Sequence, residues 1–353
     1  MHSLTKDFLE RQSITPALLT TIRELGEFKG KQALFKQQAP QVLDSLLQAA
    51  LIESTESSNR IEGVVAPRER IRELVADRTE PRNRSEQEIA GYRDVLRTIH
   101  ASYPHIPFTA GVVQQFHRDL YQFLPGKGGR WKITANEITE TRPDGTRFVR
   151  FHTVAPHQTA DAMEQLHQRF AELWDEGLLD PLLLIPAYVL DFLCIHPFLD
   201  GNGRMARLLS LLLLYHAGYE VGRYISLEQI VERTKESYYD SLYKCSQGWH
   251  EGAHSLLPWW EYFLGVMLRS AYLEFERRVG VVTTGRGAKR EMILDVIEHL
   301  PAEFRFADLE RACPGISRPT INRALADLRR LGKLILINSG RDATWKKVSE
   351  GAG

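Results

Sequence analysis

The stretch His196-Pro197-Phe198-Leu199-Asp200-Gly201-Asn202-Gly203-Arg204-Met205-Ala206-Arg207 joins two strongly apolar segments. The preceding segment, LLLIPAYVLDFLCI (residues 182–195), is apolar on every side, which predicts a helix buried in the core. The following segment, ARLLSLLLLYHAG (residues 206–218), predicts a second core helix. Asp-Gly-Asn-Gly between them is typical of a tight turn. The sequence therefore predicts a mainly α fold built around two core helices and the turn that joins them.

Two glycines and two arginines suit this turn to a phosphate group. Gly201 and Gly203 let the backbone turn sharply and approach a ligand closely. The turn ends at a helix N-terminus, where unpaired amide groups and the helix dipole favour an anion. Arg204 and Arg207 are three residues apart, so they share a helix face and are predicted to bind neighbouring phosphates.

An acidic and a basic side chain complete the turn. Asp200 offers the hard oxygen ligands that suit a Mg²⁺ shared with phosphates. His196 is the side chain best suited to take a proton near neutral pH. Each fragment alone could be a helix end or a solvated surface, but together they indicate nucleotide-phosphate chemistry.

The stretch resembles the signature of the Fic family, His-x-Phe-x-Asp/Glu-Gly-Asn-Gly-Arg-x-x-Arg, at every defined position. The resemblance implies a Fic-type helical bundle with a β-hairpin flap. It also implies a protein adenylyltransferase that uses Mg²⁺ and moves AMP from ATP to a Ser, Thr or Tyr hydroxyl of a target protein (AMPylation). In the Doc-like branch, which resembles a kinase, a lysine stands at the place of Gly203, so the glycine favours AMP transfer over phosphorylation.

The resemblance implies a role for each polar residue of the turn. His196 is the expected catalytic base, and Asp200 the expected Mg²⁺ ligand. The Asn202 side chain and the amides of residues 201–204 are expected to cradle the phosphates, while two arginines fix the β- and γ-phosphates. The ATP-binding residues predicted in this way are Glu62, Thr153, Val154, Asp200, Gly201, Asn202, Gly203, Arg204, Arg207, Tyr238, Tyr239 and Ser246.

A second short motif, Ser58-Asn59-Arg60-Ile61-Glu62-Gly63, ends an N-terminal helix. It fits the Ser/Thr-x-x-x-Glu-Gly/Asn element that faces the active site in many Fic proteins, which implies an inhibitory role for Ser58, Glu62 and Gly63. Glu62 would pair with Arg207 in the space of the γ-phosphate, because a carboxylate mimics a terminal phosphate for an arginine. An intact Glu62 also leaves open the removal of AMP from a target. Inhibition within one chain or across a homodimer stays open as well.

Two β-rich runs interrupt the helical pattern. GKGGRWKITANEITE (residues 126–140) and TRFVRFHTV (residues 146–154) are joined by the turn sequence TRPDG. By resemblance, residues 133–154 would form the flap that holds the target segment by strand addition. Thr153 and Val154 are the flap residues expected to lie near the nucleotide.

An aromatic pair follows the turn. Tyr238 and Tyr239 at helical spacing would by default be core residues. By resemblance they line the adenine pocket, with Ser246 two turns later as the polar contact to the base.

The whole-chain composition points to a cytoplasmic protein with no membrane contact. The chain of 353 residues has 45 Lys+Arg and 45 Asp+Glu, so wholesale polyanion binding is not implied. Its 3 cysteines are too few for a zinc knuckle or a disulfide framework. The N-terminus lacks a signal pattern, and no apolar run reaches the roughly 20 residues that span a bilayer.

Three segments are expected along the chain. Residues 1–105 would form an N-terminal helical region with the inhibitory motif, including a long helix that begins at Ser85, where Ser85 and Glu88 make a capping-box pattern. Residues 106–280 would form the Fic catalytic domain. The run VVTTGRGAK (residues 281–289) is predicted to be a linker to a smaller unit at 288–348.

The smaller unit, residues 288–348, has the element order of a winged helix-turn-helix domain. Helices are expected at 290–299, 306–311 and 317–331, with a turn at Pro314-Gly315 and two strands around Ser-Gly-Arg-Asp. The third helix is rich in basic residues, which fits contact with DNA, although such modules also dock proteins. The alternative function is therefore a DNA-binding transcriptional regulator whose Fic part only senses nucleotide. Basic or polar side chains of the third helix are Arg318, Asn322, Arg323, Arg329 and Arg330.

Overall fold

A computed structural model gives the fold as two compact units, one made of Met1–Gly30 with Ser45–Phe275 and the other of Lys31–Asp44 with Glu276–Gly353. Each unit is described by itself below. The structure describes residues 3–38, 40–124, 126, 128–141, 145–177, 179–284, 290, 293–294, 296–297, 303–313, 316–338, 340 and 343–348.

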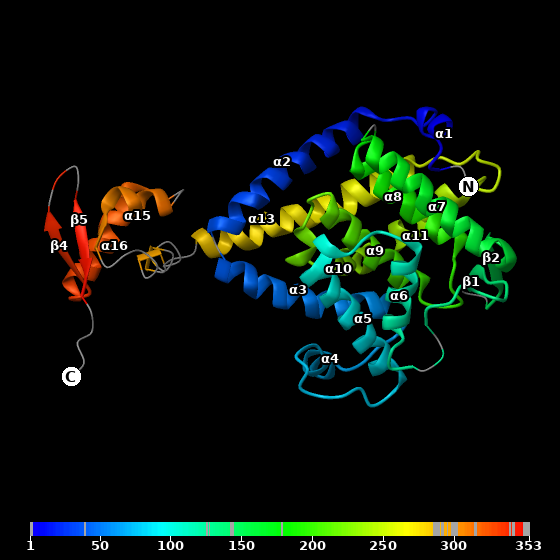
Figure 1. The fold of residues 1–353 in the computed structure, drawn as a ribbon, viewed down its shortest axis with the longest axis horizontal. Helices are drawn as coiled ribbons and strands as arrows, with labels where there is room; N and C mark the ends of the chain where they lie inside the picture. Colours follow the sequence, from blue (N-terminus) through cyan, green and yellow to red (C-terminus); the bar gives the residue numbers. More distant parts are fainter. Residues whose placement is uncertain are drawn as a thin grey trace. The chain divides into compact units, whose positions relative to one another are not determined.

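The first unit is mainly helical, and α2, α3 and α13 each have residues in both units (Figure 1). Short turns of other helix types are η1 (Tyr103–His105), η2 (Val221–Arg223) and the π-helix η3 (Glu261–Leu268). The α-helices are α1 (Lys6–Glu10), α2 (Pro16–Gln38), α3 (Pro40–Ile61), α4 (Arg68–Val75), α5 (Arg84–Ser102), α6 (Ala110–Leu120), α7 (Pro156–Glu176), α8 (Pro181–Ile195), α9 (Asn202–His216), α10 (Leu227–Arg233), α11 (Lys235–Ser246), α12 (Leu257–Trp260) and α13 (Arg269–Thr284).

The two predicted core helices are confirmed as α8 and α9. Every residue of α8 from Leu182 to Ile195 is buried, as the all-apolar sequence requires. The helix starts at its N-cap Asp180, whose carboxylate accepts the Leu182 amide, and two buried tryptophans donate to its carbonyls from α12. Helix α9 packs against α8, and α7 lies beside α8 on another side (Figure 1). A rigid apolar centre therefore carries the turn at residues 196–201.

The predicted hairpin is confirmed as β1 (Glu137–Thr141) and β2 (Arg147–His152), which pair antiparallel with a bulge between Ile138 and Thr139. Residues 142–144 of the predicted turn lie outside the described residues. The long helix expected from Ser85 begins one residue earlier: Asn83 is its N-cap, and the Asn83 side chain accepts the amide of Glu86. The predicted capping box at Ser85 was therefore wrong.

The second unit contains α15 (Phe306–Ala312), α16 (Arg318–Arg330) and a small antiparallel sheet in the order β3-β5-β4, made of β3 (Glu303–Arg305), β4 (Leu334–Asn338) and β5 (Thr344–Lys347). The last two helices and the two strands agree with the predicted elements, whereas β3 was not predicted. Apolar side chains of both helices and the sheet form one core, which includes Leu309, Leu325 and Trp345. The winged-helix assignment itself stays a prediction.

The predicted linker was partly wrong, because α13 continues through Thr284. Residues 285–289, the turn at Pro314-Gly315 and most of the helix predicted at 290–299 lie outside the described residues. Among the described residues, no helix combines the length and apolar character that a bilayer crossing needs.

Candidate active site

His196 lies at the end of α8, and its imidazole is set up to accept a proton. Its backbone is left-handed (φ 52°, ψ 58°), which turns the chain out of the helix. The Nδ1 atom lies 3.2 Å from the Leu193 carbonyl, and because a carbonyl only accepts, Nδ1 must carry the hydrogen. Nε2 then keeps its lone pair. Burial, helped by the charge of Lys132, lowers the pKa of His196 to about 4, so the ring is neutral at pH 7.

The turn after His196 is held by its own asparagine. The Asn202 side chain accepts the Phe198 amide at 2.9 Å and donates to the Phe198 carbonyl at 2.7 Å, and Asn202 is 2 % exposed. Gly201 has φ 80°, a conformation that strains any other residue. Both ends of the Asn202 side chain therefore brace the turn, Asn202 also borders the cavity described below, and its contact with phosphates stays a prediction.

Asp200 is the exposed carboxylate of the turn. Its side chain is 61 % exposed, and Oδ1 accepts the Gly201 amide at 2.7 Å. The described residues contain no group of three or more His, Cys, Asp or Glu side chains able to hold a metal ion. A single exposed carboxylate fits a Mg²⁺ that arrives with phosphates, since Mg²⁺ is usually held by one or two carboxylates and substrate oxygens. It does not fit a resident ion.

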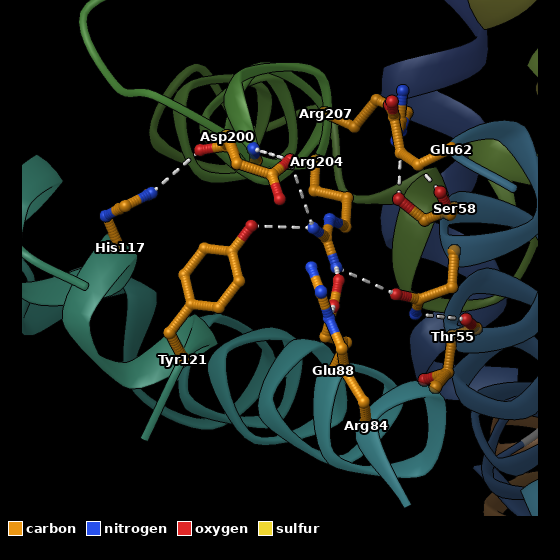
Figure 2. A network of polar contacts seen from close by, with 12 residues as sticks. Thr55, Ser58, Glu62, Arg84, Glu88, His117, Tyr121, Asp200, Arg204 and Arg207 are labelled. Carbon is orange, nitrogen blue, oxygen red and sulfur yellow. Dashed lines mark hydrogen bonds and ion pairs between the residues drawn. The ribbon is translucent and has the colours of Figure 1, made fainter. Parts of the chain in front are cut away.

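His117 on α6 packs beside the turn and also hydrogen-bonds to it. Its Nδ1 accepts the Gly129 amide at 2.9 Å, so Nε2 must carry the hydrogen and donate to the Asp200 carbonyl at 3.0 Å. The ring also stacks on Phe198 at 3.6 Å between centroids. Figure 2 shows the ring beside the Asp200 carbonyl. His117 therefore holds the backbone of Asp200, the residue whose carboxylate is exposed at the turn.

The buried His117 predicts a loss of stability in acid. Burial lowers its pKa from 6.5 to about 4, so between these values the unfolded chain binds more protons than the folded one. The contribution is fully present above pH 6.5 and is lost as the pH falls toward 4, by at most about 3 kcal/mol. Urea unfolding from pH 7 to 4 should show a flatter pH dependence in His117→Gln, which cannot titrate; an unchanged slope would contradict the assignment.

Glu62 and Arg207 form an ion pair at the start of α9 (Figure 2). The Arg207 Nη2 donates to the Glu62 carboxylate at 2.7 Å, and Nε donates to the hydroxyl of Ser58 at 2.9 Å. Gly63 has φ 77° and follows Glu62 directly after the end of α3. A Cβ added at Gly203 would overlap the Glu62 carboxylate, so the carboxylate lies directly on the turn's second glycine. The structure therefore brings Ser58 and Glu62 of the predicted inhibitory motif against Arg207 at the start of α9.

Arg204 does not lie beside Arg207 at the Glu62 carboxylate, although the three-residue spacing predicted that the two arginines would act together. It is 1 % exposed and donates to Glu88 at 2.7 Å and to the Tyr121 hydroxyl at 2.8 Å, with Asn59 at 3.4 Å (Figure 2). Its contact with Asp200 is longer, at 3.8 Å. Arg204 ties α9 to α5 and to Tyr121 after α6 and is not among the residues that line the cavity. Its guanidinium has a structural role here, and its contact with phosphates stays a prediction.

A cavity of about 600 Å³ opens beside the turn. Tyr238, Tyr239 and Ser246 line it as predicted, and the Ser246 hydroxyl donates to the Tyr243 carbonyl at 2.8 Å. The cavity is walled by Glu62, Ile138, Thr139, Arg150, Phe151, Leu190, Leu193, Cys194, His196, Leu199, Asp200, Gly201, Asn202, Gly203, Arg207, Lys235, Tyr238, Tyr239, Leu242, Tyr243 and Ser246.

Thr153 and Val154 do not line this cavity; other residues of the hairpin do. Thr153 lies at the base of the hairpin and hydrogen-bonds to Lys132 and Asn136, and Val154 borders a separate hollow next to α7. Sequence reasoning missed Lys132 and Asn136. Their one signal was a lysine and an asparagine within the β-rich run, at positions that gave no indication of burial.

Comparison with known proteins gives one family match and several solved structures of similar fold. Residues 107–214 match the Fic/DOC family model. A Fic family protein from Desulfovibrio desulfuricans G20 aligns over 97 % of this chain and 98 % of its own, with 20 % identity and a TM-score of 0.62. A Fic domain containing signaling protein from Bacteroides thetaiotaomicron VPI-5482 aligns over 74 % of this chain and 98 % of its own (22 %, TM-score 0.58).

A third solved structure, Fic-1 (residues 134–508) from C. elegans, covers 74 % of this chain and 71 % of its own, with 19 % identity and a TM-score of 0.56. At these identities the likeness shows the fold alone. A search among curated proteins finds no match. The family match spans the His196 turn, the whole of α8 and most of α9, so the part of this chain that matches the Fic/DOC family model is the part that carries the turn.

Proposed function

We propose that the protein transfers AMP from ATP to a Ser, Thr or Tyr hydroxyl of a target protein. The observation that carries the proposal is a neutral imidazole with a free Nε2 at the rim of a cavity that also holds the N-terminus of α9 and a buried arginine. The base, the anion site and the cavity are the parts that nucleotidyl transfer requires.

The cavity suits a nucleoside triphosphate in size and in chemistry. About 600 Å³ is within the range of pockets that bind small ligands. The tyrosines of α11 offer aromatic surface for a base at one side, and the glycine turn with Arg207 offers amides and a guanidinium for phosphates at the other. This arrangement would place the innermost phosphate toward His196.

The reaction then follows from the residues. His196 Nε2 takes the proton of the target hydroxyl while that oxygen bonds to the α-phosphorus; the bond from the α-phosphorus to the bridging oxygen breaks, and pyrophosphate leaves. The amides at the start of α9 would stabilise the negative charge that builds on the phosphate oxygens. Asp200 would hold Mg²⁺, which neutralises charge on the phosphates when bound.

Glu62 supplies the proposed auto-inhibition. Its carboxylate already takes the guanidinium that a terminal phosphate would use, and it lies on Gly203 at the start of the anion site. A nucleotide whose γ-phosphate binds Arg207 must displace this carboxylate or bind in another pose. The ground state would thus hold the transferase in a low-activity form.

The transfer is tested with two labelled substrates. The full chain, with Mg²⁺ and a cell lysate, is incubated with ATP labelled either on the α-phosphate or on the γ-phosphate. AMP transfer predicts label on protein from the first substrate and none from the second, since the γ-phosphate leaves with pyrophosphate. Label from the γ-phosphate alone would show phosphorylation instead and refute the proposal.

The alternative, a DNA-binding regulator, rests on α16, and two of its cations are already paired. Arg318 donates to Glu310, and Arg330 lies 2.7 Å from Asp327. The exposed Asn322, Arg323 and Arg329 are the side chains left to contact DNA or a protein partner. Absence of label from both substrates, together with tight binding of a DNA duplex by the full chain, would favour the regulator.

A further inference from the structure

The carbonyls of residues 195–198, which surround the catalytic histidine, are all held by Lys132 and Asn136. The Lys132 ammonium donates to the first carbonyl at 2.9 Å, and its main-chain amide donates to the third at 2.8 Å. The Asn136 side-chain amide donates to the second at 3.3 Å and to the fourth at 2.8 Å. Both residues lie in the segment that leads into β1, so this segment is hydrogen-bonded to the backbone on both sides of His196.

Thr153, on the other side of the hairpin, connects to both Lys132 and Asn136. It directly follows β2, and its hydroxyl lies 2.6 Å from the Asn136 carbonyl, 2.8 Å from the Asn136 side-chain oxygen and 2.8 Å from the Lys132 ammonium. The ammonium therefore has three acceptors for its three hydrogens, namely Asn136, Thr153 and the carbonyl of residue 195. Lys132 is 3 % exposed. Lys132, Asn136 and Thr153 thus form a polar node at the base of the hairpin, in which Lys132 is buried and the other two residues are partly buried.

The node matters because the backbone of His196 is strained. A left-handed conformation costs a residue with a side chain about 1–2 kcal/mol, so it persists only where the surroundings hold it. Hydrogen bonds that involve a charged donor are about twice as strong as neutral ones. Lys132 and Asn136 donate to all four carbonyls and so supply that support, with the Asn202 side chain as a second donor to the carbonyl of Phe198.

We propose that Lys132, Asn136 and Thr153 are positioning residues that couple the β1–β2 hairpin to His196. Hairpin residues Thr139 and Phe151 border the catalytic cavity, so a target segment paired with the hairpin would order both limbs. When both strands of the hairpin are ordered, the hydrogen bonds of the node stay formed, and these bonds hold the His196 imidazole in its orientation toward the cavity. The inference rests on the proposed transferase function for its consequence, but the coupling is a property of the free chain.

Two substitutions cut the node at different points. Asn136→Asp keeps the shape of the side chain but cannot donate to the two carbonyls. Thr153→Val keeps the volume and removes the link between the limbs, while Thr153→Ser retains the hydroxyl. Thr159→Val is the matched control, because within the described part of the chain that buried hydroxyl donates only to the carbonyl of Ala155, the N-cap of its own helix.

The readout that needs no activity is the tautomer of His196, observed by NMR of isotope-labelled histidine side chains. The native chain should show the hydrogen on Nδ1, as its contact with Leu193 requires. Asn136→Asp and Thr153→Val should shift the signal toward the Nε2–H form that prevails in free histidine, while Thr153→Ser and Thr159→Val keep the native signal. A native signal in both node variants would overturn the proposal.

The second readout is the kinetics of AMP transfer. Misplacing the base should lower kcat about tenfold in Asn136→Asp and Thr153→Val, with the KM for ATP within about twofold of the parent. Thr153→Ser should restore kcat. An equal fall in Thr159→Val, or a rise in KM with kcat unchanged, would contradict a positioning role. If no variant or parent transfers AMP, the proposed function fails, and the NMR signal alone decides on the node.

Discussion

His196→Ala should lower the rate of AMP transfer about a thousandfold, which lies within the usual contribution of a positioned general base. The reason is the free Nε2: its lone pair is kept available by the Nδ1 hydrogen bond to Leu193, and the low pKa of His196, about 4, keeps the ring unprotonated at pH 7. Alanine offers no acceptor at this place. The measurement is the initial rate of label transfer from α-labelled ATP.

The loss should appear in kcat and leave nucleotide binding intact. The ring borders the cavity but is not among the groups proposed to bind phosphates, so the Kd for ATP should stay within about twofold of the parent. His157→Ala is a suitable control because that histidine is exposed at the start of α7. Transfer that survives in His196→Ala at more than about a tenth of the parent rate would assign the proton transfer to another group.

The local sequence predicted the turn well because its geometry is set by neighbouring residues. The end of α8, the left-handed Gly201 and the carboxylate of Asp200 beside it follow from local sequence, whereas Gly203 lies in the first turn of α9. Arg207 also reaches the cavity. These features need no knowledge of distant segments.

Arg204 shows why the rest could not be predicted in the same way. A spacing of three residues places Arg204 and Arg207 within one broad face of α9, but it does not say which neighbour each meets. Glu88 on α5 and Tyr121 after α6 meet the first, and Ser58 and Glu62 meet the second. A buried guanidinium must be paired because an unpaired buried charge is costly, and tertiary packing decides which partners are within reach.

The polar node at the base of the hairpin could not be predicted from the sequence for a related reason. Lys132 sits in a β-rich run in which a lysine is ordinarily a solvated side chain. Its burial follows from acceptors at residues 153 and 195, far along the chain. Likewise, the choice of Asn83 rather than Ser85 as the cap of α5 depends on where the chain enters the helix, which two nearby capping residues leave undecided.

Glu62→Gly should raise the rate of AMP transfer by about a hundredfold, since close charge pairs couple by a few kcal/mol and the arginine of this pair is buried. The substitution removes the carboxylate that lies 2.7 Å from the Arg207 guanidinium and frees the space above Gly203. Arg207 then keeps its bonds to Ser58, so the guanidinium stays in place for a phosphate. The change should not harm α3, because Glu62 lies one residue beyond the end of that helix.

The control for Glu62→Gly is Glu56→Ala, which removes a carboxylate of the same helix that pairs with exposed arginines. That variant should transfer AMP at the parent rate.

The effect of Glu62→Gly should also depend on the phosphate that competes for Arg207. ADP lacks a γ-phosphate, so the ADP affinities of parent and variant should differ less than their ATP affinities. Equal transfer rates in parent and Glu62→Gly would show that the ion pair does not restrain the enzyme. A larger rate with no difference in ATP affinity would mean that Glu62 acts on the pose of the bound nucleotide and not on its entry.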